Sequence, residues 1–370
     1  TSMSDITAFI RVDASPFMGL GHLMRCLAFA NSMRSQGVRT VFICRDSQQS
    51  PKALVESEGF EIKLLPAPHK PVDVPSFSVP HAHWLGVGIP RDIEETREVI
   101  SRERGSQNWL VVDHYAIDRS WESAVRSLVD RVLVIDDLAD RDHDCDVLVD
   151  QNLYENFETR YDLRVSDHCQ KLLGPRFAIL RRQFVEARAQ IRHRRGRVNR
   201  ILVFFGGADP KNETGKALQA LRTIPFANVQ IDIVIGSLNP HRASIESIAL
   251  EIPGARTHFN IKDMAALMVS ADLYVGAGGT TTWERCCLGL PGVVVSIADN
   301  QVPLAKCMAK MGAVVDLGPS SDVTEEQIRE ALITLIAQPD QLTQIEINST
   351  KMVDGLGCQR ILDALAPVPR

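Results

Sequence analysis

The sequence has no long apolar run and no excess of positive charge. Its 370 residues are 45% hydrophobic and 24% charged, with a net charge of −5, so no general basic field is present to hold a nucleic acid or an anionic membrane. No run approaches the roughly 20 apolar residues that a membrane span requires, and the first residues lack the pattern of a secretion signal. We therefore expect a cytoplasmic protein with neither nucleic-acid nor membrane partners.

Cysteine pairs with metal-binding or redox spacing are also lacking. None of the eight cysteines forms a CxxC pair, and most lie in apolar segments such as FIC and ERCCLGL, which is typical of buried thiols. A metal site from His81, His83, His143 and Cys145 is conceivable, but these spacings match no standard zinc pattern, and solvated loop histidines explain them as well. The sequence therefore predicts no metal and no cofactor.

Apolar runs of strand length alternate with amphipathic stretches along the whole chain. Helical patterns such as Leu23–Gln36 and Trp121–Leu128 separate the runs of the first half. A second series begins at RILVFFGGADP and continues through VQIDIVIG, ADLYVGAGG, PGVVVSI and AVVDLG. Such alternation is typical of parallel sheets flanked by helices, so we predict an α/β fold with two domains. The strands predicted in the first half are Ala8–Val12, Thr40–Cys44, Glu61–Leu65, Trp109–Asp113, Arg131–Asp136 and Val147–Val149.

The charged segment Glu186–Arg200 is interpreted as a solvated linker, since the chain supplies no matching basic surface for a nucleic acid. We therefore assign residues 1–190 to an N-terminal domain and residues 191–350 to a C-terminal domain. Residues 351–370 form a C-terminal helix, for which packing on the N-terminal domain is one option. The proline-rich segment Pro66–Pro90 is equally compatible with a binding loop and with irregular surface.

The stretch RVDASPFMGLGHLMRCLAFA places glycines and a histidine between a predicted strand and a predicted helix. Gly19 and Gly21 allow close approach of the backbone to a ligand, and the helix N-terminus favours an anion. At that position His22 should be kept neutral and able to accept a proton. The structural alternative is a histidine that caps a tight turn. Asp13 and Arg25 flank the loop, where each could orient His22 or the substrate or be purely structural.

The second half contains two more glycine loops after predicted strands. Gly206 and Gly207 stand in FFGGADPKNET, and VGAGGTTTWERCCLG opens a helix with Gly278, Gly279 and a threonine run. Two such loops in one domain predict a diphosphate site, and neither matches the GxxxxGK[ST] pattern of P-loop ATPases. Glu284, one turn into the helix, suits the two hydroxyls of a ribose, with a glutamate that only complements the helix dipole as the alternative.

Together these motifs resemble the GT-B nucleotide-sugar enzymes. The chain is most similar to the UDP-2,4-diacetamido-2,4,6-trideoxy-β-L-altropyranose hydrolases of pseudaminic acid biosynthesis, themselves similar to the peptidoglycan N-acetylglucosaminyltransferases. The resemblance extends in order over nearly the whole chain and implies two doubly wound Rossmann-type domains facing across a cleft. Its motifs are RVDAS, GLGHLMRCLAFA, VVDHYAI, IDDLADRDHDCDVLVDQN, LLGPRFAILRRQF, FFGGADPKN, GAGGTTTWE and ADNQ.

The resemblance implies that residues 1–190 are the sugar-binding and catalytic domain and residues 191–350 the UDP-binding domain, and it implies roles for individual residues. His22 would be the general base on water, and Tyr115 a second catalytic residue. The UDP half would supply Gly206 and Gly207, the phosphate loop and Glu284 at the ribose. Asn300 and Gln301 would face the sugar or the diphosphate, and Ile261 would line the uracil site. The implied phosphate loop consists of Gly278, Gly279, Thr280, Thr281 and Thr282.

The implied reaction is metal-independent hydrolysis of a UDP-linked diacetamido-trideoxy sugar at the anomeric C1–O bond, with inversion. Positioned water and a base suffice, because loop amides and helix N-termini can stabilise the leaving diphosphate. A GT-B glycosyltransferase that uses a UDP-amino sugar and a non-catalytic nucleotide-sugar binding protein are the alternatives. The segment Pro66–Pro90 is longer than the corresponding connection of the family, which puts the geometry of any lid in doubt.

Overall fold

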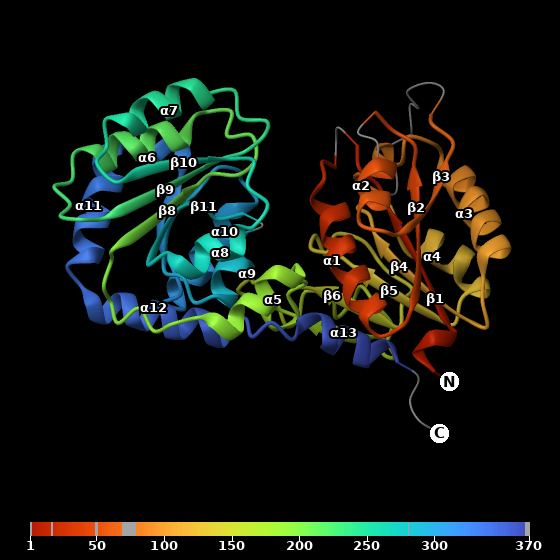
Figure 1. Ribbon diagram of the computed structural model, residues 1–370. Helices are drawn as coiled ribbons and strands as arrows, with labels where there is room; N and C mark the ends of the chain where they lie inside the picture. Colours follow the sequence, from red (N-terminus) through yellow and green to blue (C-terminus); the bar gives the residue numbers. More distant parts are fainter. Residues whose placement is uncertain (1, 16–17, 49–50, 69–78, 280, 367–370) are drawn as a thin grey trace. The chain divides into compact units, whose positions relative to one another are not determined.

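The computed structural model describes residues 2–15, 18–48, 51–68, 79–279 and 281–366. The chain forms two compact units (Figure 1). The first unit contains residues 1–152, 156–182 and 356–370, and the second contains residues 153–155 and 183–355. The chain thus passes between the units near residues 182 and 355. The sequence analysis instead predicts these boundaries after residues 190 and 350.

The first unit is built on a seven-stranded parallel sheet in the order β3-β2-β1-β4-β5-β6-β7. Most of its strands are buried along their length, because helices cover both faces of a parallel sheet. The strands are β1 (Ile6–Val12), β2 (Arg39–Arg45), β3 (Glu61–Leu65), β4 (Gln107–Asp113), β5 (Arg131–Ile135), β6 (Val147–Asp150) and β7 (Gln170–Leu173).

Alternate side chains of β1 pack against different helices. Ala8, Ile10 and Val12 belong to the core beneath α1 and α13, whereas Phe9 belongs to the core with residues of α3 and α4. Figure 1 shows α3 and α4 on the side of the sheet away from α1. The helices of this unit are α1 (Gly21–Ser35), α2 (Pro51–Ser57), α3 (Ile89–Glu103), α4 (Arg119–Val125) and α13 (Gly357–Leu365), and α5 (Arg182–Ala187) begins at its boundary with the second unit.

The second unit repeats the design with a six-stranded parallel sheet in the order β10-β9-β8-β11-β12-β13. The strands are β8 (Arg200–Phe204), β9 (Gln230–Ile235), β10 (Ala255–Phe259), β11 (Leu273–Ala277), β12 (Gly292–Ser296) and β13 (Val315–Pro319). The helices are α6 (Glu213–Arg222), α7 (Arg242–Leu250), α8 (Met264–Ser270), α9 (Thr281–Cys287), α10 (Gln301–Lys310), α11 (Glu325–Ile336) and α12 (Pro339–Met352).

Most of the segment Glu186–Arg200 is exposed or half-buried, as its charge predicts, but Arg194 is an exception. The side chain of Arg194 is buried, and its guanidinium group donates hydrogen bonds to the carbonyl oxygens of Met268, Ala271, Leu288 and Gly289. These carbonyls need donors where chain segments end in the interior, and an arginine offers five N–H groups. The prediction of a solvated segment was therefore wrong at this position.

The segment Pro66–Pro90 is partly ordered. Residues 69–78 lie outside the part of the chain that the structure describes. After them a single 3₁₀ turn, η2 (Ala82–Leu85), leads through Gly86 to α3, which begins at Ile89. Within the described residues, no helix is long and apolar enough to cross a membrane.

Candidate functional site

The first sheet changes winding direction between β1 and β4. The chain runs from β1 outward through β2 and β3 and then returns to β4 on the other side of β1. In open parallel sheets, ligands bind outside the carboxyl ends of the strands at this switch point. Val12 and Asp113, the last residues of β1 and β4, are paired in register. The glycine loop after β1 and the DHY motif at the end of β4 therefore meet here.

The imidazole of His22 forms a close pair with a buried carboxylate. His22 stands in the first turn of α1, and its Nδ1 lies 2.6 Å from Oδ1 of Asp113. Because an ionised carboxylate only accepts hydrogen bonds, this contact places a proton on Nδ1 and leaves the lone pair of the neutral ring on Nε2. The pair therefore sets the tautomer that a general base requires.

Arg25 holds the carboxylate from the other side. Its Nε and Nη2 donate to the two oxygens of Asp113, both at 2.8 Å. Burial by itself would raise the pKa of Asp113, but the Arg25 guanidinium and the His22 ring hold that pKa well below its usual range. Asp113 therefore stays ionised. Of the three roles weighed for Arg25, these contacts favour that of orienting His22, through Asp113.

Tyr115 packs against the same histidine through its ring. The Tyr115 and His22 rings meet edge to face with centroids 4.6 Å apart, and the Tyr115 hydroxyl donates to Oδ1 of Asp137 at 2.5 Å. Burial raises the pKa of Tyr115, and the adjacent Asp137 carboxylate raises it further. The hydroxyl therefore remains protonated and committed to Asp137, whose other oxygen lies 3.6 Å from Nη1 of Arg25.

Asp13 belongs to a separate buried network. Its carboxylate accepts hydrogen bonds from the guanidinium of Arg11, from the backbone N–H of Arg45 and from Nε2 of His114. Although burial alone would raise its pKa, Arg11 and His114 hold the pKa of Asp13 far below its usual range. These bonds tie β1 to β2 and β4, so the structural role is the one that the geometry supports for Asp13.

In the loop after β1, Gly19 has a conformational role in addition to the predicted close approach to a ligand. Gly19 has φ +65°, and its N–H donates to the Ser15 carbonyl at 2.8 Å, so the turn itself requires glycine. Gly21 is the first residue of α1, and a Cβ at either glycine would meet no described atom within 4 Å. The described residues therefore leave space next to Gly19 and Gly21.

The second sheet has its own switch point, between β8 and β11. Gly206 and Gly207 follow β8, and Gly278 and Gly279 follow β11, so parallel pairing brings both loops to one edge. Gly206 has φ +89° with open space at its Cβ position. The two loops predicted to hold a diphosphate therefore lie on neighbouring strands.

Residues after β12 reach the same edge. A Cβ on Gly279 would lie 3.0 Å from Nε2 of Gln301, whose Oε1 accepts the N–H of Ile297 at 3.0 Å. Asn300 immediately precedes α10. Ile261 is half-buried and follows β10, two strands from β8. The structure therefore brings Gln301 to the glycine loop and places Ile261 farther along the edge.

The threonine run is only partly available to a ligand. Thr280 lies outside the described residues, and Thr281 approaches the Tyr274 hydroxyl at 3.4 Å. Thr282 is 2% exposed and its hydroxyl is buried, because the first turn of α9 points this side chain inward. That hydroxyl has no hydrogen-bond partner among the described residues, so its contact with a phosphate stays a prediction. Glu284, also in the first turn of α9, is 9% exposed.

Several groups considered at the sequence level are engaged elsewhere. Nδ1 of His143 lies 2.6 Å from Glu122, and the Cys145 and Cys169 sulfurs are 3.6 Å apart. In the described ranges no cluster of three or more histidine, cysteine, aspartate or glutamate side chains is arranged to hold a metal ion.

Sequence reasoning did not identify Asp113 and Asp137 as site residues. Asp113 stands in the quoted VVDHYAI motif and Asp137 in IDDLADRDHDCDVLVDQN. Each lies at or just beyond the carboxyl end of a strand. That position was the available signal, because carboxyl ends of neighbouring parallel strands share one edge of a sheet.

Comparison with known sequences gives two partial matches, and no family model matches the chain. The spore coat polysaccharide biosynthesis protein SpsG of Bacillus subtilis is 31% identical over 189 residues, which are 51% of this chain and 56% of that protein. The uncharacterized protein MJ1062 of Methanocaldococcus jannaschii is 23% identical over 292 residues, or 77% of this chain and 54% of that protein. The chain thus spans about half the length of the curated relatives it matches.

Solved structures match over nearly the whole chain. MurG of Acinetobacter baumannii has a TM-score of 0.68 at 16% identity, covering 98% of this chain and 99% of that one. A UDP-glucosyltransferase from Polygonum tinctorium has a TM-score of 0.66 at 12% identity, with the same coverage. The calicheamicin glycosyltransferase CalG4 has a TM-score of 0.61 at 14% identity, again with this coverage. These matches show the fold, and the chain consists of two Rossmann-like domains of the GT-B type.

Proposed function

We propose that this chain hydrolyses a UDP-linked 2,4-diacetamido-2,4,6-trideoxy sugar at its anomeric C1–O bond, with inversion, releasing UDP and the free sugar. The observation that carries the proposal is the His22–Asp113 pair at the switch point of the first sheet, with its 2.6 Å contact. A histidine whose Nδ1 is held by a buried carboxylate is arranged to accept a proton at Nε2.

The nucleotide-sugar part of the proposal draws on the comparisons. The chain matches a protein named for polysaccharide biosynthesis, and its fold is that of enzymes named as glycosyltransferases. A further structure with this fold, UGT89C1 of Arabidopsis thaliana, is a complex with UDP. The specific sugar and the hydrolytic outcome rest on the motif resemblance.

In the proposed reaction Nε2 of His22 removes a proton from water as the water oxygen bonds to the anomeric carbon. The C1–O bond breaks on the opposite face, and its electron pair leaves with the diphosphate. Loop amides after β8 and β11 stabilise the charge of UDP, a role in which preorganised N–H donors are effective. Asp113 stabilises the imidazolium that forms, and Arg25 keeps Asp113 in place.

The test is incubation with this UDP-sugar in ¹⁸O-labelled water, without an acceptor and with EDTA. We expect UDP release, with the label only in the free sugar. Label in UDP, or in UMP and sugar phosphate, would show attack at phosphorus and refute the mechanism. Absence of UDP release without an acceptor, with release restored by one, would favour the glycosyltransferase alternative. Binding without turnover under any condition would leave the binding-protein alternative.

A further inference from the structure

Two buried cysteines of the first unit have their sulfur atoms in contact. Sγ of Cys145 lies 3.6 Å from Sγ of Cys169, although the two residues are 24 positions apart in the chain. That separation gives no CxxC pattern, so the spacing of the cysteines in the sequence does not reveal the pair. Cys145 is 1% exposed and Cys169 is 7% exposed. Cys169 is therefore the more accessible of the two sulfurs.

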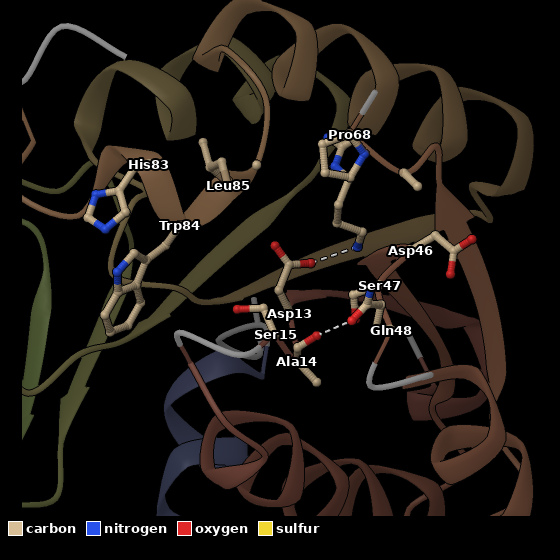
Figure 2. Close-up of a pocket in the computed structure, with 13 residues that line it drawn as sticks. Asp13, Ala14, Ser15, Asp46, Ser47, Gln48, Pro68, His83, Trp84 and Leu85 are labelled. Carbon is tan, nitrogen blue, oxygen red and sulfur yellow. Dashed lines mark hydrogen bonds between the residues drawn. The ribbon is translucent and has the colours of Figure 1, made fainter. Parts of the chain in front are cut away.

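The pair lies at the edge of the first sheet opposite to the candidate site. Cys145 precedes β6 and Cys169 precedes β7, so both stand at the amino ends of their strands. The His22–Asp113 contact is formed at the carboxyl ends. A pocket of about 640 Å³, shown in Figure 2, also lies at the carboxyl ends of β1 and β2, and its described lining includes neither cysteine. The pair is therefore separate from the candidate site and from this pocket.

The strands that follow the two cysteines run side by side. β6 and β7 are parallel neighbours with Val147 opposite Gln170, and the N–H of Gln170 donates to the Asp146 carbonyl at 2.9 Å. Neighbouring strands lie about 4.8 Å apart, which falls within the roughly 4.4–6.8 Å that a disulfide spans between Cα atoms. A bond between Cys145 and Cys169 therefore requires only a small movement of side chains whose sulfurs are already in contact.

The contact also makes the two sulfurs chemically different. With the Cys145 S–H group as donor, it stabilises the thiolate form of Cys169, which lowers the pKa of Cys169 and raises that of Cys145. Burial raises the pKa of Cys145 further. Because the thiolate is the form that attacks a disulfide, Cys169 is the sulfur suited to attack first.

We propose that Cys145 and Cys169 form a reversible disulfide when the folded protein meets a small disulfide oxidant such as oxidised glutathione. The Cys169 thiolate attacks one sulfur of the oxidant, whose S–S bond breaks and releases a first thiolate. The Cys145 thiol then loses its proton and attacks Sγ of Cys169 in this mixed disulfide, which releases a second thiolate. The two cysteines lose two electrons and two protons, and the oxidant takes up both to become two thiols.

The disulfide closes a covalent loop over the segment between β6 and β7. Residues 151–169, all of which the structure describes, contain turns and bends but neither a helix nor a strand. Tertiary contacts hold them instead: the Tyr161 hydroxyl donates to Oδ2 of Asp136 at 2.8 Å, and Arg160 donates to the Asp137 carbonyl at 3.2 Å. A covalent loop restricts the unfolded chain. Oxidation therefore stabilises the first unit and the segment that supports Asp137.

Peptide mapping of the full-length protein tests the linkage. Reduced protein is incubated with oxidised glutathione without denaturant, quenched with acid, alkylated and digested with trypsin. The two cysteines fall in separate peptides, residues 142–160 and 165–171, because each peptide follows an arginine and ends at an arginine or lysine. We expect mass spectrometry to show these two peptides linked, and dithiothreitol to separate them. A glutathione adduct on Cys169 without this linkage, or linkage of either cysteine to another one, would overturn the proposal.

Thermal unfolding measures the consequence of the bond. Oxidation should raise the midpoint of unfolding of the parent protein by about 5 °C or more. Cys307, which is 9% exposed in α10, provides the matched control. Cys307→Ser should keep both the linkage and the rise in midpoint, whereas Cys145→Ser should lose both. An unchanged or lower midpoint in the linked parent protein would refute the stabilising role.

Two single variants test the order of attack. Cys145→Ser retains the attacking thiol, so a glutathione adduct should accumulate on Cys169, whereas Cys169→Ser should leave Cys145 unmodified. An adduct on Cys145 in the Cys169→Ser protein would refute the assigned order. The linkage itself is measured on the parent protein and thus does not depend on the folding of either variant. None of these measurements uses a nucleotide sugar, so their results are independent of the proposed function.

Discussion

Asp113→Asn is the substitution that tests the candidate base most sharply. Oδ1 of Asp113 lies 2.6 Å from Nδ1 of His22. An asparagine amide turned toward the ring would donate to Nδ1, which would move the imidazole proton to Nε2 and remove the lone pair that accepts the proton from water. We expect turnover of the UDP-sugar to fall about 10²–10⁴-fold, the range for loss of a general base or of its correct tautomer.

The same substitution has a cost in stability that must be measured separately. Arg25 donates twice to Asp113 at 2.8 Å, and its side chain is 12% exposed. Removing one partner of such a buried pair costs about 3–5 kcal/mol, a substantial part of the roughly 5–15 kcal/mol that stabilises a domain. Denaturant unfolding of the variant should show this loss, and the assay should use conditions in which the variant is folded.

His22→Asn and the double variant provide the comparison. If Asp113 acts through His22, His22→Asn should lose about 10²–10⁴-fold, and the double variant should be no slower than the slower single variant, because residues that act as a unit are not additive. UDP affinity, measured by calorimetry, should change little in all three. Near-normal turnover in a folded Asp113→Asn variant, or multiplicative losses in the double variant, would refute the reasoning.

Three further predictions concern the ribose, the tyrosine and acid stability. Glu284→Ala should weaken UDP binding by about 1–3 kcal/mol, as for loss of a charged hydrogen-bond partner. Unchanged UDP affinity in calorimetry would show that Glu284 only complements the helix dipole. Tyr115→Phe keeps the ring against His22 but removes the bond to Asp137, so turnover should fall less than about tenfold; a loss beyond about 10²-fold would instead show that the hydroxyl takes part in the chemistry. The pKa of Asp113 is lower in the folded than in the unfolded protein, so its ionised carboxylate stabilises the fold above about pH 4 and this stabilisation is lost as the pH falls. The difference in the free energy of unfolding between the parent protein and Asp113→Asn should therefore narrow by about 1 kcal/mol between pH 7 and pH 3. A gap that stays constant in unfolding measurements across that range would contradict this linkage.

Much of the architecture was predictable because both sheets are parallel and covered on both faces. Their central strands are continuous apolar runs, so the sequence predicts Trp109–Asp113 as most of β4, and it also predicts the edge strand Glu61–Leu65 with the observed bounds. The α/β class with two Rossmann-type domains is confirmed. The sequence analysis missed β7 and β10, which lie at the sheet edges. Their half-exposed residues mix apolar and polar side chains and give no continuous run.

The sequence by itself determined the alternation of strands and helices along the chain, the glycine turns and the position of His22 at the start of a helix. These depend on local properties: apolar periodicity, the positive φ of Gly19 and Gly206, and a helix following each loop. Only the tertiary structure decided which groups meet. Asp113 is 91 residues from His22 in the chain, and pairing of β1 with β4 brings them together.

The tertiary structure also decided which polar groups are committed. Asp13 and Thr282 look as available in the sequence as Asp113 does, yet Asp13 is held by Arg11 and His114, and the Thr282 hydroxyl is buried without a hydrogen-bond partner among the described residues. Local sequence does not encode either outcome, because the first depends on partners supplied by distant elements and the second on burial that only packing creates. The sequence therefore specifies candidate residues and the loops that present them, whereas packing selects the carboxylate that pairs with His22.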